Sequence, residues 1–130
     1  MGRFDAASPA ERRALIADAI DAHRSRGSRY CTLTAGSRPE ESVPAWVQYR
    51  AVDSLCNVDV EEGELDRLVT LLDDVGGATI DEQRSPEDLE GINVRIRIHG
   101  DDERVAQFVD RVFRRVYDRP ADYRLWATEI

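Results

Sequence analysis

The segment from Ile92 to His99 alternates strictly between aliphatic and polar side chains. The aliphatic residues occupy every second position: Ile92, Val94, Ile96 and Ile98. The residues between them are polar: Asn93, Arg95, Arg97 and His99. Successive side chains of a β-strand point to opposite faces of its sheet. The alternation therefore predicts a strand in an antiparallel sheet that has one buried face and one polar face.

Two segments with helical periodicity lie on either side of this strand in the sequence. The first has an apolar stripe that stops before Gly76-Gly77: Leu65, Leu68, Val69, Leu72 and Val75. The second keeps the helical period over three turns: Val105, Phe108, Val109, Val112, Phe113 and Val116. An apolar stripe at this spacing is typical of a helix that packs on one side against a core. Both helices are expected on the buried face of the sheet.

Strands are also expected at 54–60 and 78–84, and residues 123–130 fit either a strand or a helix. We assign the tail as a strand, because the second helix then becomes an ordinary crossover back to the sheet. From about residue 54 the order is β-α-β-β-α-β, which predicts a ferredoxin-like split βαβ arrangement. In that α+β fold, both helices cover one face of an antiparallel sheet.

The residues before 54 add a helix and one or two strands to a single α+β domain that spans residues 1–130. Ser8 can cap the helix, and one helical face carries Leu15, Ile16, Ala19, Ile20 and His23, with Arg12 and Arg13 elsewhere. A strand is expected at 30–34, followed by a polar loop at 36–44. Residues 45–60 fit one bent strand or a hairpin. These segments extend the sheet, cover its free face, or do both.

The charge composition is unusual, since the chain has 18 basic residues, all of them arginine, and 26 acidic residues. The net charge of -8 argues against generic binding to nucleic acid or to anionic membranes. An excess of acids together with arginine in place of lysine favours a halophilic archaeal source, because carboxylates keep a protein soluble in strong salt. The chain lacks an apolar run of membrane-spanning length and a leader-like start, so a cytoplasmic location is expected.

Several segments resemble those of a family of small acidic haloarchaeal proteins that carry a domain of unknown function. These segments are 46–49, 65–68, 85–91, 93–95 and 103–117, together with the end of the chain at Trp126. The resemblance covers nearly the whole chain. It implies a single domain and a haloarchaeal setting, and it carries over no functional residues.

The ligand-binding candidates are Arg95, Arg97, His99 and Trp126. The two arginines and the histidine form a basic stripe on the polar face, which suits an anion. The favoured interpretation of the arginines is cross-strand pairing with Asp81 and neighbouring acids. The aromatic residues Tyr30, Trp46, Tyr49 and Trp126 could form a binding platform, but core packing under the N-terminal segment is favoured for them.

No catalytic set is recognisable, because no nucleophile motif or phosphate-binding loop is present. Cys31 and Cys56 lack the spacing of a zinc site, so neither metal nor cofactor is predicted. Arg111, Arg114 and Arg115 are expected on a solvated helix face balanced by acids such as Asp110, with docking of an acidic partner as the alternative. We expect a non-catalytic, homodimeric interaction module rather than an enzyme. The alternative is a small-ligand-binding regulatory domain of ferredoxin-like type.

Overall fold

The computed structural model describes residues 5–27, 30–35, 45–85 and 91–128. The N-terminal elements are β1 (Asp5–Ala6), α1 (Pro9–Arg26), β2 (Cys31–Ala35) and β3 (Trp46–Arg50). The remaining elements are β4 (Leu55–Val60), α2 (Glu62–Val75), β5 (Ala78–Arg84), β6 (Ile92–Ile98), α3 (Asp102–Arg111), the π-helical segment η1 (Val112–Val116) and β7 (Leu125–Thr128). The loop expected at 36–44 lies outside the described residues.

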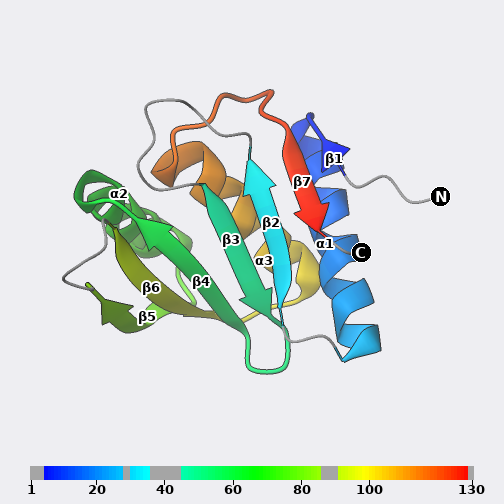
Figure 1. The fold of residues 1–130 in the computed structure, drawn as a ribbon, viewed down its shortest axis with the longest axis horizontal. Coiled ribbons are helices and arrows are strands. Elements are labelled where there is room, and N and C mark those ends of the chain that lie inside the picture. The colour runs from blue at the N-terminus through cyan, green and yellow to red at the C-terminus, as the bar shows by residue number, and fades with distance from the viewer. Residues whose placement is uncertain (1–4, 28–29, 36–44, 86–90, 129–130) are drawn as a thin grey trace.

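The described strands form one open sheet in the order β1-β7-β2-β3-β4-β6-β5, in which every pair of neighbours is antiparallel. All the helices pack on the same face of this sheet, behind it in Figure 1. Helix α3 lies between α1 and α2, since it contacts α1 directly and its continuation η1 contacts α2. The fold is therefore a two-layer α+β domain. Within the described residues, no helix has the length and apolarity needed to cross a membrane.

The strand order differs from that of the expected ferredoxin-like arrangement. That arrangement would give the order β7-β4-β6-β5, but the hairpin of β2 and β3 stands between β7 and β4. The reason is local pairing. A short turn at 51–54 joins β3 to β4, and β3 pairs with the edge of β4 that β7 would otherwise use. The final strand β7 then pairs with β2 instead of β4. Residues 45–60 are accordingly a hairpin and not one bent strand.

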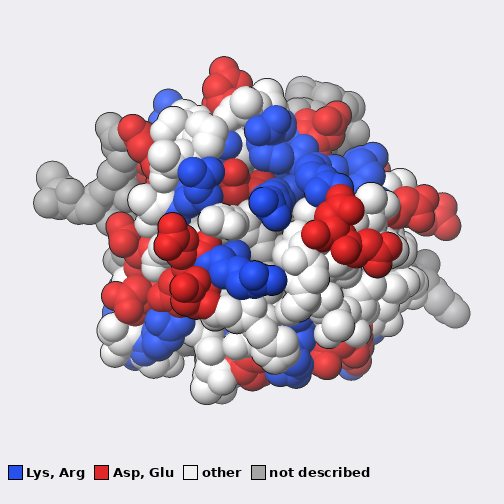
Figure 2. Space-filling view, turned by 180° about the vertical axis from the view of Figure 1, so that it is seen from behind, with Lys and Arg blue, Asp and Glu red and all other residues white. Residues whose placement is uncertain are grey.

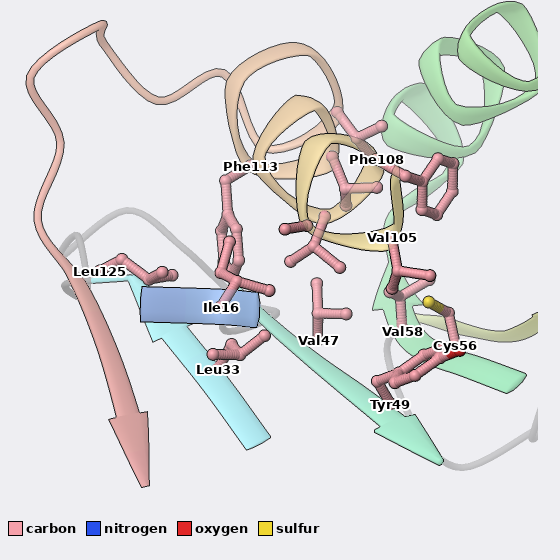
Figure 3. Packing of buried hydrophobic residues seen from close by; sticks show 14 of the residues in the cluster. Ile16, Leu33, Val47, Tyr49, Cys56, Val58, Val105, Phe108, Phe113 and Leu125 are labelled. Carbon is pink, nitrogen blue, oxygen red and sulfur yellow. The ribbon is translucent and has the colours of Figure 1, made fainter. Parts of the chain in front are cut away.

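The core lies between the sheet and the helices and draws on alternate residues of the central strands (Figure 3). From the strands come Leu33, Val47, Tyr49, Cys56, Val58, Val94, Ile96, Ile98 and Leu125. The helices contribute Ile16, Ile20, Leu68, Leu71, Val105, Phe108, Val109 and Phe113. This interdigitation confirms the expected sidedness of the strand at 92–98. Of its four aliphatic residues, only Ile92 is not fully buried.

Helix α2 is rotated relative to the stripe expected from its sequence. Leu68 and Leu71 are fully buried, whereas Val69 is 44% exposed. Leu65, Leu72 and Val75 are only partly buried. The helix packs against η1 as well as against β4 and β5. Its buried residues therefore face η1 and the sheet together, and not the sheet alone.

Helix α1 confirms most of its expected pattern. Ser8 caps it by accepting a hydrogen bond from the Glu11 backbone NH, and His23 and the aliphatic residues of the expected face are buried. The exception is Arg12, which was assigned away from that face and is 0% exposed. Arg12 precedes Ile16 by four residues, and residues four apart share one face of a helix. The helical period therefore places Arg12 on the buried face. Its charge is compensated there by Asp110.

Candidate functional site

Within the described ranges, one face of the sheet carries no helix; it is the main candidate site, and we call it the open face. It is turned toward the viewer in Figure 1. Its side chains alternate with the core residues along the strands: Thr32, Thr34, Trp46, Gln48, Arg50, Asn57, Asp59, Asn93, Arg95, Arg97 and Trp126. Most of them are partly exposed, and none belongs to the hydrophobic core. The open face is thus polar at its centre, with aromatic and charged groups on either side.

The centre of the open face is a row of hydrogen-bonded side chains. Asn93 donates to the Oδ1 atoms of Asn57 at 2.8 Å and of Asp59 at 2.9 Å. Asn57 donates to Gln48 Oε1 at 3.4 Å, and Gln48 donates to Thr32 Oγ1 at 3.5 Å. Each amide therefore has a defined orientation across four neighbouring strands. Hydrogen bonds linked in a chain also polarise one another.

The β7 side of the open face carries both tryptophans of the chain. Thr34 pairs in register with Trp46 on β3 and with Trp126 on β7, so the threonine lies between the two aromatic residues. Trp126 is 46% exposed. The expectation that Trp46 and Trp126 pack in the core is therefore wrong, whereas Tyr49 is a core residue. The reason is register, because the position of each residue in its strand decides which face receives its side chain.

The opposite side of the open face carries arginines that pair with carboxylates. Arg95 Nη1 lies 3.5 Å from Glu82 Oε2, and Arg97 Nη2 lies 3.6 Å from Asp81 Oδ2. Arg97 also donates to the Asp53 carbonyl at 2.8 Å. The cross-strand pairing favoured from the sequence is present in both cases. These arginines carry counter-charges and do not form a bare cationic stripe.

Arg50 is a further charged residue of the open face and lies at the turn between β3 and β4. Its Nε donates to Asp53 Oδ1 at 2.8 Å, and its guanidinium lies 5.4 Å from the centre of the Tyr30 ring. The hydrogen bond from Arg50 holds the pKa of the Asp53 carboxyl below its ordinary value. Asp53 therefore stays ionised as the partner of this arginine at neutral pH.

The four ligand-binding candidates do not form one group. Arg95 and Arg97 lie on β6, and Trp126 lies on β7, with β2, β3 and β4 between them. Four strand spacings of ~4.8 Å separate the two strands by about 19 Å. His99 follows the end of β6, where it is exposed and its backbone NH bonds to the Gly77 carbonyl. One small ligand could not contact Trp126 and the β6 residues together.

The two cysteines face the core and not the open face. Burial raises the pKa of the Cys31 thiol to about 12, and it also raises the pKa of Cys56. Both thiols are therefore protonated at neutral pH and poor nucleophiles, since the thiolate is the reactive form. In the described ranges, no group of three or more His, Cys, Asp or Glu residues is arranged to hold a metal ion.

A buried polar cluster that the sequence analysis missed joins α1, α3 and the segment before β7. Arg12 Nε donates to Asp110 Oδ1 at 2.8 Å, and the Tyr123 hydroxyl donates to the same oxygen at 2.7 Å. The Arg12 guanidinium also stacks on the Tyr123 ring at 4.0 Å and donates to the carbonyls of Ala7, Ala121 and Tyr123. Because these contacts are internal, the cluster anchors structure and presents nothing for a ligand.

The arginines of the last helix lie on the opposite side of the molecule, where positive and negative side chains alternate (Figure 2). A hollow of about 410 Å³ between α2 and η1 is lined by Asp66, Arg67, Thr70, Arg114, Arg115 and Asp118. Arg67 donates twice to the Val116 carbonyl, and Arg115 pairs with Asp74 at 2.6 Å. The expectation that Asp110 balances the arginines of this solvated face is wrong, because Asp110 is buried and pairs with Arg12. This face is mixed in charge and holds η1 in place.

The fold and the open face together define the class of this protein: a two-layer α+β domain with an open antiparallel sheet. The chain belongs to a family of unknown function, DUF7975, which matches residues 1–130. This agrees with the expected membership in a family of unknown function. The comparisons with curated proteins and with solved structures found no match.

Proposed function

We propose that the protein is a non-catalytic interaction module whose open face is its binding surface. The observation that carries this proposal is the row of oriented amides from Thr32 to Asn93 on a face without a covering helix. Side chains already held in one orientation lose little conformational entropy when a partner binds. The residues of the row are partly exposed, so their polar groups can be reached by that partner.

The first occupant that we propose is a second copy of the chain. It would bind the side of the open face away from β7, which we call the charged part. Four arginines and four carboxylates meet there: Arg50, Arg84, Arg95, Arg97, Asp53, Asp59, Asp81 and Glu82. This surface is therefore neutral, although the whole chain carries a net charge of -8. A two-fold axis brings the same patch of both copies together. Arginines of one copy can then approach carboxylates of the other without net repulsion.

Size-exclusion chromatography with light scattering tests this dimer over a wide range of protein concentrations. We expect a mass near twice the 14.7 kDa of one chain. The double variant Gln48→Arg/Asn57→Arg adds two charges at the centre of the open face and should give monomers. Gln107→Arg on α3 is the matched control and should leave the dimer intact. A wild-type protein that stays monomeric at every concentration would overturn this form of the proposal.

The second occupant that we propose is a small organic ligand on the β7 side of the open face. We call the region around its two tryptophans the tryptophan part. The observation that favours it is the row formed by Trp46, Thr34 and Trp126, two aromatic residues with a short side chain between them. Both parts use β3, through Arg50 in the charged part and through Trp46 in the tryptophan part, and Asp59 borders both. The two forms are tested separately, the dimer by its mass and the ligand by its binding.

We propose no catalytic role for this chain. The raised pKa values of Cys31 and Cys56 support this proposal, since they disfavour the nucleophilic thiolate. His23 is buried at the end of α1, and His99 is exposed beyond the end of β6. The proposed setting is the cytoplasm of a halophilic archaeon, and the acidic, lysine-free composition supports it.

A further inference from the structure

We propose that Trp46, Thr34 and Trp126 form a slot that binds an organic ammonium cation, with a quaternary ammonium group as the best fit. The inference rests on the small-ligand form of the proposed function and names the ligand class for that site. It concerns the β7 side of the open face, where two tryptophans flank a threonine in one cross-strand row.

The row is fixed by backbone pairing on both sides of Thr34. Strand β2 pairs with β3 through Thr34 and Trp46, and with β7 through Thr34 and Trp126. The Tyr117 hydroxyl donates to the Trp46 carbonyl at 3.2 Å and to the Asp59 carbonyl at 2.6 Å. One hydroxyl thus links the neighbouring ends of β3 and β4, so Asp59 lies beside Trp46 in the same row. Asp5, Trp126, Thr34 and Trp46 are paired in register across the sheet. Val47 pairs with Val58 on β4, so the register continues to Asp59 beside Trp46.

The spacing of the strands sets the width of the slot. Two spacings of ~4.8 Å separate the Trp46 and Trp126 backbones by about 9.6 Å, and strand side chains stand roughly perpendicular to the sheet. With each ring above its own strand, a cation above Thr34 would lie about 4.8 Å from each ring, within the ~6 Å range of cation–π attraction. A planar ring in contact with both tryptophans needs only about 7–8 Å, at ~3.5–4.0 Å per contact. The slot therefore fits a rounded ammonium group better than a flat ring.

The local charge complements a cation. Asp5 and Asp59 stand at the outer sides of the two tryptophans. Asp5 is already paired with Arg124. Asp59 accepts a hydrogen bond from the neutral amide of Asn93, and among the described residues no arginine forms an ion pair with it. The Asp59 carboxylate lies beyond Trp46, two strand spacings or about 9.6 Å from Thr34, and adds a longer-range attraction for a cation in the slot.

Tryptophan fluorescence offers a direct test, because both tryptophans of the chain lie at the proposed slot. The wild-type protein is titrated with tetramethylammonium chloride at constant ionic strength, kept constant with KCl. We expect a saturable change in emission. Neopentyl alcohol has a similar shape without the charge and should bind at least fivefold more weakly. An equal response to both compounds, or one that never saturates, would overturn the inference.

Three variants and one control locate the binding within the row. Thr34→Leu fills the slot and Trp126→Leu removes one wall, so each should weaken tetramethylammonium binding at least fivefold, while Asp59→Asn should weaken it about threefold. Val69→Ala, on the helical side, is the control and should bind like the wild type. Far-UV circular dichroism shows whether each variant is folded. Unchanged affinity in folded Thr34→Leu would also overturn the inference.

A thermal-shift screen of uncharged and anionic compounds separates this inference from the proposed function. If another compound stabilises the wild type but not Thr34→Leu, the small-ligand function stands and the ammonium assignment falls. If tetramethylammonium binds with the expected variant pattern, both are supported. If no compound binds at the slot, both are overturned, and only the dimer form of the proposal continues.

Discussion

At the scale of single residues, Arg12 is a buried charge whose guanidinium has several partners, although its Nη2 atom is buried without a hydrogen bond among the described residues. The side chain is 0% exposed and meets the Asp110 carboxylate, three backbone carbonyls and the Tyr123 ring. Burying an unpaired charge costs several kcal/mol. One partner, Ala7, is near in sequence, and the others, Asp110, Ala121 and Tyr123, come from the last part of the chain. The same burial, together with the neighbouring Asp110 carboxylate, raises the pKa of Tyr123, so its hydroxyl remains protonated and keeps its bond to Asp110.

The Arg12–Asp110 pair gives a prediction about stability. Arg12→Met should reduce the free energy of unfolding by about 3–5 kcal/mol, because it leaves Asp110 buried without a counter-charge. Urea unfolding followed by circular dichroism measures this loss. Arg13→Met is the matched control, since Arg13 is partly exposed, and it should change stability by less than about 0.5 kcal/mol.

The double variant Arg12→Met/Asp110→Leu removes both charges together. It should recover a large part of the lost stability, because no isolated charge remains in the core. If the double variant were as unstable as the sum of the two single variants, the pair would have no electrostatic coupling. The interpretation of the cluster as a mutually compensated pair would then be wrong.

At the scale of elements, an ion pair fastens the end of α1 to the start of α3. Two Arg24 nitrogens donate to Asp102, at 2.9 and 2.5 Å. The arginine lies in the last turn of its helix and the aspartate in the first turn of the other, where each charge is favoured by the helix dipole. The hydrogen bond from Arg24 lowers the pKa of Asp102. This pair therefore stabilises the contact between two long-range neighbours.

This ion pair predicts a dependence of stability on pH. A lowered pKa in the folded state means that the stabilisation is present above the unfolded pKa of ~3.9 and is lost as the pH falls through the folded value. Asp102→Asn should therefore cost up to about 1 kcal/mol near pH 7, because the pair is partly exposed. The difference from the wild type should disappear in acid. Urea unfolding across a pH series measures it.

The double variant Arg24→Gln/Asp102→Asn separates the pair from other effects of Asp102. In the Arg24→Gln background, Asp102→Asn should produce a much smaller pH-dependent loss. Asp18→Asn, at an exposed position of α1, serves as the control and should follow the wild-type pH profile. A wild-type advantage that stays constant from neutral to acid pH would contradict the assignment of the effect to this carboxylate.

At the scale of the whole molecule, the net charge of -8 is the main electrostatic term. Repulsion among like charges destabilises a compact state. Salt screens exposed charges over about 10 Å at 0.1 M and over about 3 Å at 1 M. The buried Arg12–Asp110 pair is less affected by screening than the surface carboxylates. The balance should therefore shift in favour of the folded state as salt rises.

We predict that the midpoint of thermal unfolding rises by several degrees between 0.05 and 0.5 M KCl. The physical reason is weaker repulsion among surface carboxylates, with each ~1 kcal/mol giving ~4–8 °C in a small domain. A charge-reduced variant, Asp73→Asn/Asp74→Asn, should show a smaller rise. Differential scanning calorimetry measures the midpoints. A midpoint that is flat or falls with KCl would show that repulsion does not limit stability.

The sequence allowed a large part of the layer structure to be predicted, but not the strand order. The alternation at 92–98 indicated which side of β6 is buried, and the spacing of Val105, Phe108 and Val112 indicated the buried side of α3. Such periodicities are local and depend on only a few consecutive residues. The partner of β7 is not local, because β2 and β4 are both antiparallel candidates for a final strand. Only the pairing of β3 with β4 decided between them.

The same distinction applies to the candidate site. The sequence by itself determined the two-faced character of β6, its polar residues and the acidic net charge, since these follow from alternation and composition. Only the tertiary structure decided that Trp46, Thr34 and Trp126 share a row, that Trp126 is far from Arg95, and that Arg12 meets Asp110. The physical reason is that register and long-range contacts are set by packing between distant segments, and no pattern within one segment records them.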